Sequence, residues 1–330
     1  MCQAAETGDP AVLRMLGSRY TVVDGGLAST LQAGGYEVDG DPLWSARLLA
    51  THPHAIKKVH TAFLEAGAEV LVCGSYQASV SGFQQHLSTT REEALALIGR
   101  SATLALDAVQ EFEKGERGDH PKVVAGSVGP YGACQADGSE YTGSYIPSMT
   151  QSDLMTWHRP RLEALAGAGL RVVALETLPA LSEALALLGL LREFPDLKAW
   201  VTFSCKDAKH TSYGDHFGEA VKACYEQGRD QLIAVGVNCS PPHLITPLLQ
   251  EASQLLPSPK ILPRVVYPNS GEEWVAGKGW KARGDEISWP FLDEVGVWAE
   301  MGAQLVGGCC RLGPVDIANI AGVLRSLPDP

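Results

Sequence analysis

The sequence predicts a single (β/α)8 barrel domain, an α/β TIM barrel, that spans residues 1–330. Eight short runs of apolar and β-branched residues alternate with segments whose apolar residues recur at helical spacing. The runs are apolar throughout, which is typical of parallel strands covered on both faces. Eight such units in 330 residues favour a closed barrel over an open, Rossmann-like sheet, and no Gly-x-Gly-x-x-Gly motif follows any run.

Each predicted strand ends in polar, cysteine or glycine residues. The first run closes on Asp24 and two glycines, and the fourth is apolar until its terminal carboxylate, Glu176. Pro263 lies inside the seventh run and cannot donate a ladder hydrogen bond, which argues against a regular strand there. The runs are Thr21–Gly26, Glu69–Cys73, Lys122–Gly129, Arg171–Thr177, Ala199–Cys205, Leu232–Asn238, Ile261–Tyr267 and Gln304–Gly308.

Helices are predicted between successive strands. Ile56, Val59 and Phe63 recur at helical spacing, and Thr90–Glu93 forms a capping box at the start of the next helix. Ser288–Pro290 places a capping serine and a first-turn proline before the last strand. The other helices end at Gly169, cover Ser182–Phe194, Glu219–Gln227 and His243–Leu256, and include Ile317, Ile320 and Leu324.

Two connections are longer than an ordinary strand-to-helix loop. One is glycine-rich and runs from Pro130 to Pro147, and the other runs from Tyr267 to Ser288 and contains Trp274 and Trp280. Loops of this length usually form lids or binding loops, and both follow the carboxyl end of a predicted strand, where barrel enzymes keep their active sites.

Composition favours small-molecule chemistry in the cytoplasm. Lys and Arg number 26 against 38 Asp and Glu, a net charge of -12, which argues against nucleic-acid or anionic-membrane partners. No run of about 18 apolar residues predicts a membrane span. Residues 1–10 include Glu6 and Asp9 and lack a signal-peptide pattern. Eight cysteines in a chain of this length are too few for a secreted disulfide framework, so we expect reduced thiols.

Polar residues gather at the predicted strand ends, which meet at one mouth of a barrel. They are Asp24, Tyr76, Ser127, Glu176, Ser204, Cys239, Asn269, Cys309 and Cys310. A carboxylate such as Glu176 is costly to bury without a cationic partner, whereas Asp24 could equally cap a helix. Trp44, like the two tryptophans of the second long loop, could equally serve packing.

Three of these residues predict an open metal site. Cys239 ends one apolar strand, and Cys309 and Cys310 follow another, so three thiolates could hold one Zn²⁺ per chain. Packing alone and a strained vicinal redox pair are the alternatives, although the C-x-x-C spacing of a redox motif is absent. The remaining strand and helix cysteines, Cys73, Cys205 and Cys224, are expected to be core residues, and the role of Cys134 is open.

Such a site suits one kind of reaction. Three thiolates give Zn²⁺ a net charge of -1, which makes it a weak Lewis acid toward water. A substrate thiol in the fourth position would remain a nucleophilic thiolate at neutral pH. Attack on a cationic methyl donor would then neutralise charge, which a low-dielectric barrel mouth favours. The residues therefore predict thiol alkylation without a separate general base.

The chain resembles the zinc-dependent homocysteine S-methyltransferases. The resemblance rests on Val23–Gly26, Asp41–Ser45, Gly126–Gly132, Glu176–Thr177, Gly236–Ser240, Tyr267–Gly271 and Gly307–Arg311. It implies that Cys239, Cys309 and Cys310 bind zinc and that Glu176 and Asp24 hold the amino group of homocysteine. Trp44 and Tyr76 match positions near the metal and the donor. We also expect Ser127 and Asn238 to bind substrate.

The resemblance points to the branch of the family that uses S-methylmethionine. Residues 129–143 carry this likeness, and S-adenosylmethionine is a second candidate sulfonium donor. The oligomerisation arm of the betaine-dependent enzyme has no counterpart, which favours a monomer or weak oligomer. Betaine as donor, selenocysteine or selenohomocysteine as acceptor, a non-catalytic zinc or thiol sensor, and a metal-free lyase with Glu176 as base are the alternatives.

Overall fold

A computed structural model describes residues 20–115, 122–228, 230–275, 279–281 and 291–328. Its eight-stranded sheet is parallel and follows the order β1-β10-β7-β6-β5-β4-β3-β2. A bridge between Val23 and Val70 joins the first strand to the last, so the sheet closes and the predicted (β/α)8 barrel is confirmed. The strands are β1 (Thr21–Val22), β2 (Val70–Val72), β3 (Val123–Val128), β4 (Val172–Leu178), β5 (Lys198–Phe203), β6 (Leu232–Asn238), β7 (Arg264–Tyr267) and β10 (Ala303–Val306).

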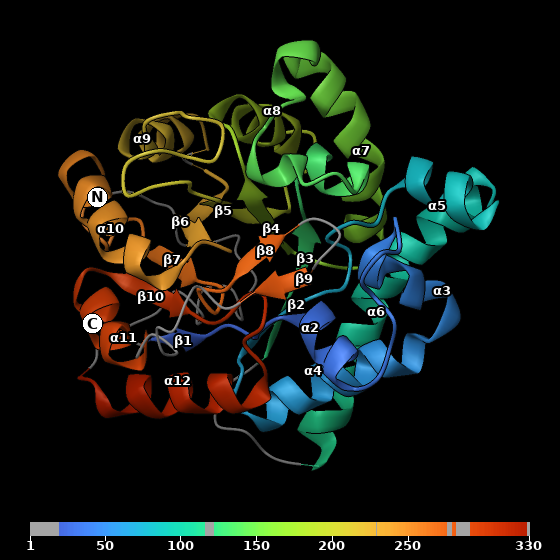
Figure 1. Cartoon of the computed structure of the whole chain (residues 1–330), viewed down its shortest axis with the longest axis horizontal. Coiled ribbons are helices and arrows are strands. Elements are labelled where there is room, and N and C mark those ends of the chain that lie inside the picture. The colour runs from blue at the N-terminus through green and yellow to red at the C-terminus, as the bar shows by residue number, and fades with distance from the viewer. Residues whose placement is uncertain (1–19, 116–121, 229, 276–278, 282–290, 329–330) are drawn as a thin grey trace.

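Helices form a ring around the sheet (Figure 1). The predicted capping box is present, because Thr90 N donates to Glu93 Oε2 over 2.8 Å and Glu93 N donates to Thr90 Oγ1 over 3.2 Å. None of the described helices is long and apolar enough to cross a membrane. The helices are α2 (Leu27–Ala33), α3 (Leu48–Thr51), α4 (Pro53–Glu65), α5 (Val80–Leu87), α6 (Arg91–Gly115), α7 (Gln151–Gly167), α8 (Leu181–Leu191), α9 (Phe217–Gly228), α10 (Ile245–Leu255), α11 (Phe291–Glu300) and α12 (Pro314–Ser326).

The seventh strand is shorter than predicted. It begins at Arg264 rather than Ile261, because Pro263 has no N–H to donate to the sheet. The carbonyl oxygen of Pro263 still accepts a hydrogen bond from Val235 N over 3.2 Å. Helix α5 was not predicted, since Phe83 is its only buried residue and its apolar periodicity is therefore weak.

Part of the second long loop is ordered as a hairpin. Strands β8 (Glu273–Val275) and β9 (Gly279–Lys281) are antiparallel, with Trp274 opposite Trp280 in the backbone register. The predicted helix start at Ser288–Pro290 lies outside the described residues.

The core has an inner and an outer layer, as alternating side chains of each strand require. The inner cluster is made mostly of valine and alanine side chains from the strands, together with Trp200 and Tyr267. The outer cluster lies between the sheet and the helices and includes Cys73, Cys205 and Cys224, which are buried as predicted. Because these two apolar layers provide the core, the residues at the carboxyl ends of the strands can be polar.

Candidate metal centre

A cavity of about 710 Å³ lies at the carboxyl ends of the strands. Every residue predicted to bind metal or substrate contributes to its wall, whereas Ser204 and Asn269 of the predicted strand-end group do not. The predicted residues in the wall are Asp24, Trp44, Tyr76, Ser127, Glu176, Asn238, Cys239, Cys309 and Cys310. The structure therefore brings these residues together, whereas their individual roles remain predictions.

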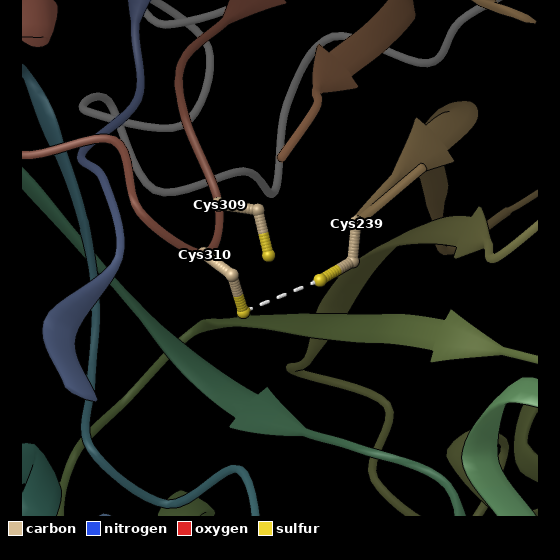
Figure 2. Close-up of side chains that lie close together, drawn as sticks. All are labelled: Cys239, Cys309 and Cys310. Carbon is tan, nitrogen blue, oxygen red and sulfur yellow. Dashed lines mark hydrogen bonds between the residues drawn. The ribbon is translucent and has the colours of Figure 1, made fainter. Parts of the chain in front are cut away.

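The three cysteines converge from two strand ends (Figure 2). Cys239 directly follows β6, and Cys309 and Cys310 follow β10. Their Sγ atoms lie within 4.8 Å of one another, and Cys239 Sγ is 3.5 Å from Cys310 Sγ. Strand β7 lies between β6 and β10 in the sheet, so the sulfurs meet across its end.

The chain at the end of β7 holds both cysteine segments. Cys239 N donates to Tyr267 O over 3.0 Å, and Cys309 N donates to Pro268 O over 2.7 Å. Ser270 N donates to Cys310 O over 3.2 Å, and the amide of Asn269 donates to Cys239 O over 3.3 Å. Asn269, one of the predicted strand-end residues, thus supports a cysteine through its backbone.

Cys239 adopts a left-handed backbone conformation with φ 48°, and so does Thr177 at the end of β4 with φ 58°. Such conformations are unfavourable for residues other than glycine and persist where neighbouring contacts hold them. Here Asn238 supplies the contacts: its Oδ1 accepts from Thr177 N over 2.7 Å, and its Nδ2 donates to Thr177 Oγ1 over 2.8 Å. Asn238 therefore fixes the turn that presents Cys239.

The two glycines before Cys309 allow a close backbone approach. A Cβ atom at Gly307 would lie 2.6 Å from Val23 O, and one at Gly308 would lie 2.7 Å from Leu312 Cβ. With no side chain in the way, Gly308 N donates to Asp24 O over 3.0 Å. This hydrogen bond places the Cys309–Cys310 segment beside the end of β1.

The donor set fits a zinc ion. Zn–S bonds of about 2.3 Å in a tetrahedron separate the sulfur atoms by about 3.8 Å, which is close to the observed spacing. Hydrogen bonding with Cys309 and Cys310 lowers the pKa of the Cys239 thiol well below its usual value, and the same contacts with Cys239 raise the pKa of the Cys309 and Cys310 thiols, so one thiolate is favoured and a bound cation would stabilise the other two. Three soft sulfur ligands leave one tetrahedral position for a further ligand, which is the arrangement of an open zinc site.

Two buried carboxyl groups lie in the same cavity. Asp24 is 3% exposed, and Glu176 is 7% exposed. Burial raises the pKa of Asp24 well above its usual value, with the nearby Glu176 as a further cause, although Asp24 Oδ2 accepts a hydrogen bond from Val72 N over 3.0 Å. Burial also raises the pKa of Glu176 to about 7, despite hydrogen bonds from Ser127 Oγ and the Tyr267 hydroxyl. A cation between these groups would stabilise both as carboxylates.

Trp44 and Tyr76 form an aromatic part of the wall. Their rings meet edge to face, with centroids 6.2 Å apart and an angle of 65° between the planes. The backbone of Trp44 also adopts the left-handed conformation, with φ 47°. Burial raises the pKa of the Tyr76 hydroxyl well above its usual value, so this hydroxyl is neutral at physiological pH.

The loop after β3 adds residues to the cavity wall that were not predicted individually, among them Glu140 and Tyr141. Glu140 and Tyr141 lie on the short helix η3 (Ser139–Tyr141), and both line the cavity. The Tyr141 hydroxyl is 3.4 Å from Cys239 Sγ. Ser204, a predicted strand-end residue, donates from Oγ to Glu140 O over 3.2 Å and so supports the loop. The signals in the sequence were the unusual length of this loop and the resemblance of residues 129–143 to the S-methylmethionine branch, and neither singled out Glu140 or Tyr141.

A buried network outside the cavity anchors this loop at both ends. The carboxylate of Glu183 on α8 accepts hydrogen bonds from Tyr131 N over 2.7 Å and from the Tyr145 hydroxyl. His158 Nε2 also lies 2.9 Å from Glu183 Oε1, and Arg161 donates to His158 Nδ1 over 3.1 Å. The Arg161 guanidinium is directed to backbone carbonyls, including Tyr76 O at 2.8 Å. The segment between residues 131 and 145 is therefore held over the barrel mouth.

Comparison with known proteins agrees with this geometry. The family model described as homocysteine S-methyltransferase matches residues 21–324. A homocysteine S-methyltransferase from Escherichia coli is 40% identical over 91% of this chain and 93% of its own length. Homocysteine S-methyltransferase 4 of Zea mays is 42% identical, covering 92% and 89%. A betaine-homocysteine S-methyltransferase of Drosophila melanogaster is 40% identical, covering 90% and 91%.

Solved structures give the same result. The metallated form of the E. coli homocysteine methyltransferase MmuM superimposes with a TM-score of 0.80 at 37% identity, covering 92% of this chain and 96% of that one. Its oxidised form gives a TM-score of 0.81 at 38% identity, covering 92% and 95%. With the barrel and the cysteine-lined cavity described above, these matches establish that the chain belongs to the homocysteine S-methyltransferase family and is an enzyme that transfers a methyl group to homocysteine.

Proposed function

We propose that this enzyme uses one zinc ion and a sulfonium donor, S-methylmethionine, to convert homocysteine to methionine. The observation that carries the proposal is the convergence of Cys239, Cys309 and Cys310 in a cavity that also holds buried carboxyl groups. Zinc held by these three thiolates would keep the homocysteine sulfur as a thiolate at neutral pH. The metallated MmuM structure supports metal binding in a relative at 37% identity.

Asp24 and Glu176 are the proposed partners of the homocysteine amino group. Both are buried, and neither forms an ion pair with any of the described residues. An ammonium group would supply the missing positive charge, and Ser127 would keep the Glu176 carboxylate oriented through its hydrogen bond. Asn238 lines the cavity and holds the Thr177 turn through two hydrogen bonds, so it is proposed to bind substrate as well as to support the segment that carries Cys239.

The reaction needs no general base in the transfer step. The homocysteine thiolate attacks the methyl carbon, a new carbon–sulfur bond forms, and the bond to the donor sulfur breaks. The donor sulfur keeps the electron pair and leaves as a neutral thioether. Negative and positive charge disappear together, so an environment of low dielectric constant favours the step.

The choice of donor rests on the loop between residues 129 and 143. S-Adenosylmethionine has the same sulfonium chemistry and is the second candidate. The fly relative is named for betaine and matches over 91% of its length, so chain length does not separate betaine from sulfonium donors. Selenohomocysteine or selenocysteine would fit the same site as an acceptor, because a selenolate is also a soft nucleophile.

Metal analysis and a donor assay test the proposal together. Anaerobically purified protein should contain about one zinc per chain. Methionine should form from homocysteine with S-methylmethionine, faster than with S-adenosylmethionine or betaine. Cys309→Ser should lose zinc and lower turnover by more than about a hundredfold, beyond the loss typical of residues that only orient a ligand.

Cys134→Ser is the matched control. Cys134 lies in the loop after β3 and its Sγ is 3.3 Å from Gln77 O, a contact that a serine hydroxyl can keep. This variant should retain zinc and turnover. A Cys309→Ser enzyme with full zinc content and full activity would contradict the proposal. Activity that survives chelation would favour a metal-free reaction. Zinc binding without turnover of any donor would favour a sensor.

We further propose a cytoplasmic location and a monomer or weak oligomer. Reduced thiols persist best in a reducing compartment such as the cytosol, and all seven described cysteines are free. Light scattering on eluting protein at micromolar concentration should give the mass of one chain, 35.1 kDa. A stable higher mass would contradict the monomer.

A further inference from the structure

Glu140 presents an unsatisfied acceptor at the cavity. Its Oε2 atom is shielded from solvent and has no hydrogen-bond partner among the described residues. The residue lines the cavity, and none of the ion pairs between described residues includes it. A buried carboxylate oxygen without a partner is costly, so this position is arranged for a group that the protein itself does not supply.

The backbone that carries Glu140 is held in place. Glu140 O accepts a hydrogen bond from Ser204 Oγ over 3.2 Å, and the next residue, Tyr141, contacts Cys239 Sγ at 3.4 Å. The Glu183 anchor fixes the chain on both sides of this turn. Burial, with the nearby Cys239 sulfur as a further cause, raises the pKa of Glu140 to about 7. A cation beside the carboxylate would therefore favour its ionised form.

The cavity offers no cation of its own. No Lys, Arg or His occurs among the described residues that line it. Arg161 does not line the cavity, and its guanidinium donates hydrogen bonds to Gly129 O over 2.6 Å and to Tyr76 O over 2.8 Å. The pair formed by Asp24 and Glu176 suits one ammonium group, whereas Glu140 comes from a separate loop. The site thus has acidic groups for two positively charged groups, the ammonium of homocysteine and a cationic group of the donor.

We propose that Glu140 binds the cationic group of the methyl donor and selects cationic amino-acid donors of the sulfonium type. This inference rests on the proposed function, since it assigns the donor half of the same cavity. The group that Glu140 binds is either the sulfonium centre of the donor or its ammonium group. These two pairings predict different changes in KM and kcat when the Glu140 charge is removed. Pairing with an ammonium remote from the reacting atoms stabilises substrate and transition state alike, so its loss raises KM alone. Pairing with the sulfonium favours the ground state, so its loss raises KM and leaves kcat equal or higher.

The test compares Glu140→Gln with the wild-type enzyme on two donors, at saturating homocysteine and with zinc content measured. One donor is S-methylmethionine, and the other is dimethylsulfonioacetate, a sulfonium that has no ammonium group. Loss of a charged hydrogen bond should raise KM for S-methylmethionine about tenfold to a hundredfold. An increase for both donors assigns Glu140 to the sulfonium, and an increase for S-methylmethionine alone assigns it to the ammonium. KM for homocysteine should change less than about twofold.

Controls separate a specific effect from misfolding and from general charge. Glu219→Gln removes an acidic group on α9 that is exposed and does not line the cavity. It should leave KM for both donors within about twofold. Glu140→Asp keeps the charge and should lie between wild type and Glu140→Gln. Unchanged donor KM in a folded, zinc-loaded Glu140→Gln enzyme overturns the inference, as does an effect on homocysteine alone. If wild-type enzyme turns over no donor, the proposed function fails instead.

Discussion

His60 is a single residue whose burial links stability to pH. Its side chain on α4 is fully buried, and neither ring nitrogen has a hydrogen-bond partner among the described residues. Burial lowers the pKa of His60 from 6.5 to about 4. The folded protein thus keeps a neutral imidazole while the unfolded chain protonates below pH 6.5. The contribution to stability is complete above pH 6.5 and is lost as the pH falls toward 4.

Urea unfolding at pH 7.5 and pH 5 measures this contribution. With the stated pKa values, His60 should account for about 2 kcal/mol of the stability lost between these two conditions. His60→Leu should reduce the difference between the two pH values by about that amount. His54→Leu, an exposed position on the same helix, should leave the difference unchanged. An equal pH dependence in wild type and His60→Leu would contradict the assignment.

At the scale of residues, strand-end chemistry was predictable and loop chemistry was not. Asp24, Glu176 and Cys239 interrupt or end apolar strands, and barrel geometry alone places such residues at one mouth. Glu140 and Tyr141 lie in a loop without periodicity, and their position depends on contacts made elsewhere. The anchoring carboxylate, Glu183, lies 52 and 38 residues beyond its partners Tyr131 and Tyr145, so sequence alone could not reveal the pairing.

At the scale of elements, the anchor between α8 and the loop after β3 should be the main support of that loop. Glu183→Gln keeps the shape of the side chain but replaces one carboxylate oxygen by an amide donor. It leaves one of its hydrogen-bond partners unsatisfied in a site with no solvent exposure. We expect a loss of about 1–3 kcal/mol in the free energy of unfolding and faster proteolysis within residues 130–147.

Glu193→Gln provides the matched control for this prediction. Glu193 pairs with Arg159 through two contacts of 2.9 and 2.7 Å, but both side chains are partly exposed. Surface ion pairs contribute about 0–1 kcal/mol, so this variant should differ little from wild type. Equal losses for the two variants, or unchanged cleavage of the loop in Glu183→Gln, would argue against an anchoring role.

The differences between predicted and observed elements have local physical causes. Helix α5 has one buried residue, so its sequence lacks the apolar residues at helical spacing from which a helix is predicted. Strand β7 begins after Pro263, which lacks the donor that a central strand needs. By contrast, the capping box at Thr90–Glu93 is a local hydrogen-bond pattern, and such patterns can be predicted without tertiary contacts.

At the scale of the whole molecule, the metal centre and the core are separate sources of stability. The core clusters fill the barrel interior and the space under the helices, whereas the three sulfurs meet at the rim. Removal of zinc by a chelator should therefore lower the unfolding temperature by several degrees without loss of the far-ultraviolet circular dichroism of the fold. Zinc at a thousand times its dissociation constant would contribute about 4 kcal/mol.

Readdition of zinc should restore the unfolding temperature, and Cys309→Ser should not respond to chelator. Unfolding on chelation, as in small zinc-dependent domains, would mean that the metal is part of the core. The barrel itself was predictable because eight apolar strands must be covered on both faces, and this requirement applies to the entire chain.

Three residues at the barrel mouth have a left-handed backbone conformation, and this limits how the site could be transferred to another protein. Trp44, Thr177 and Cys239 all line the cavity with positive φ angles that most side chains avoid. A designer who copied only the three cysteines onto an unrelated barrel would place them on relaxed backbone, with the sulfurs directed elsewhere. A larger set of residues would have to be transferred together: the cysteines, the hydrogen-bonded pair Asn238 and Thr177, and the turn after β7.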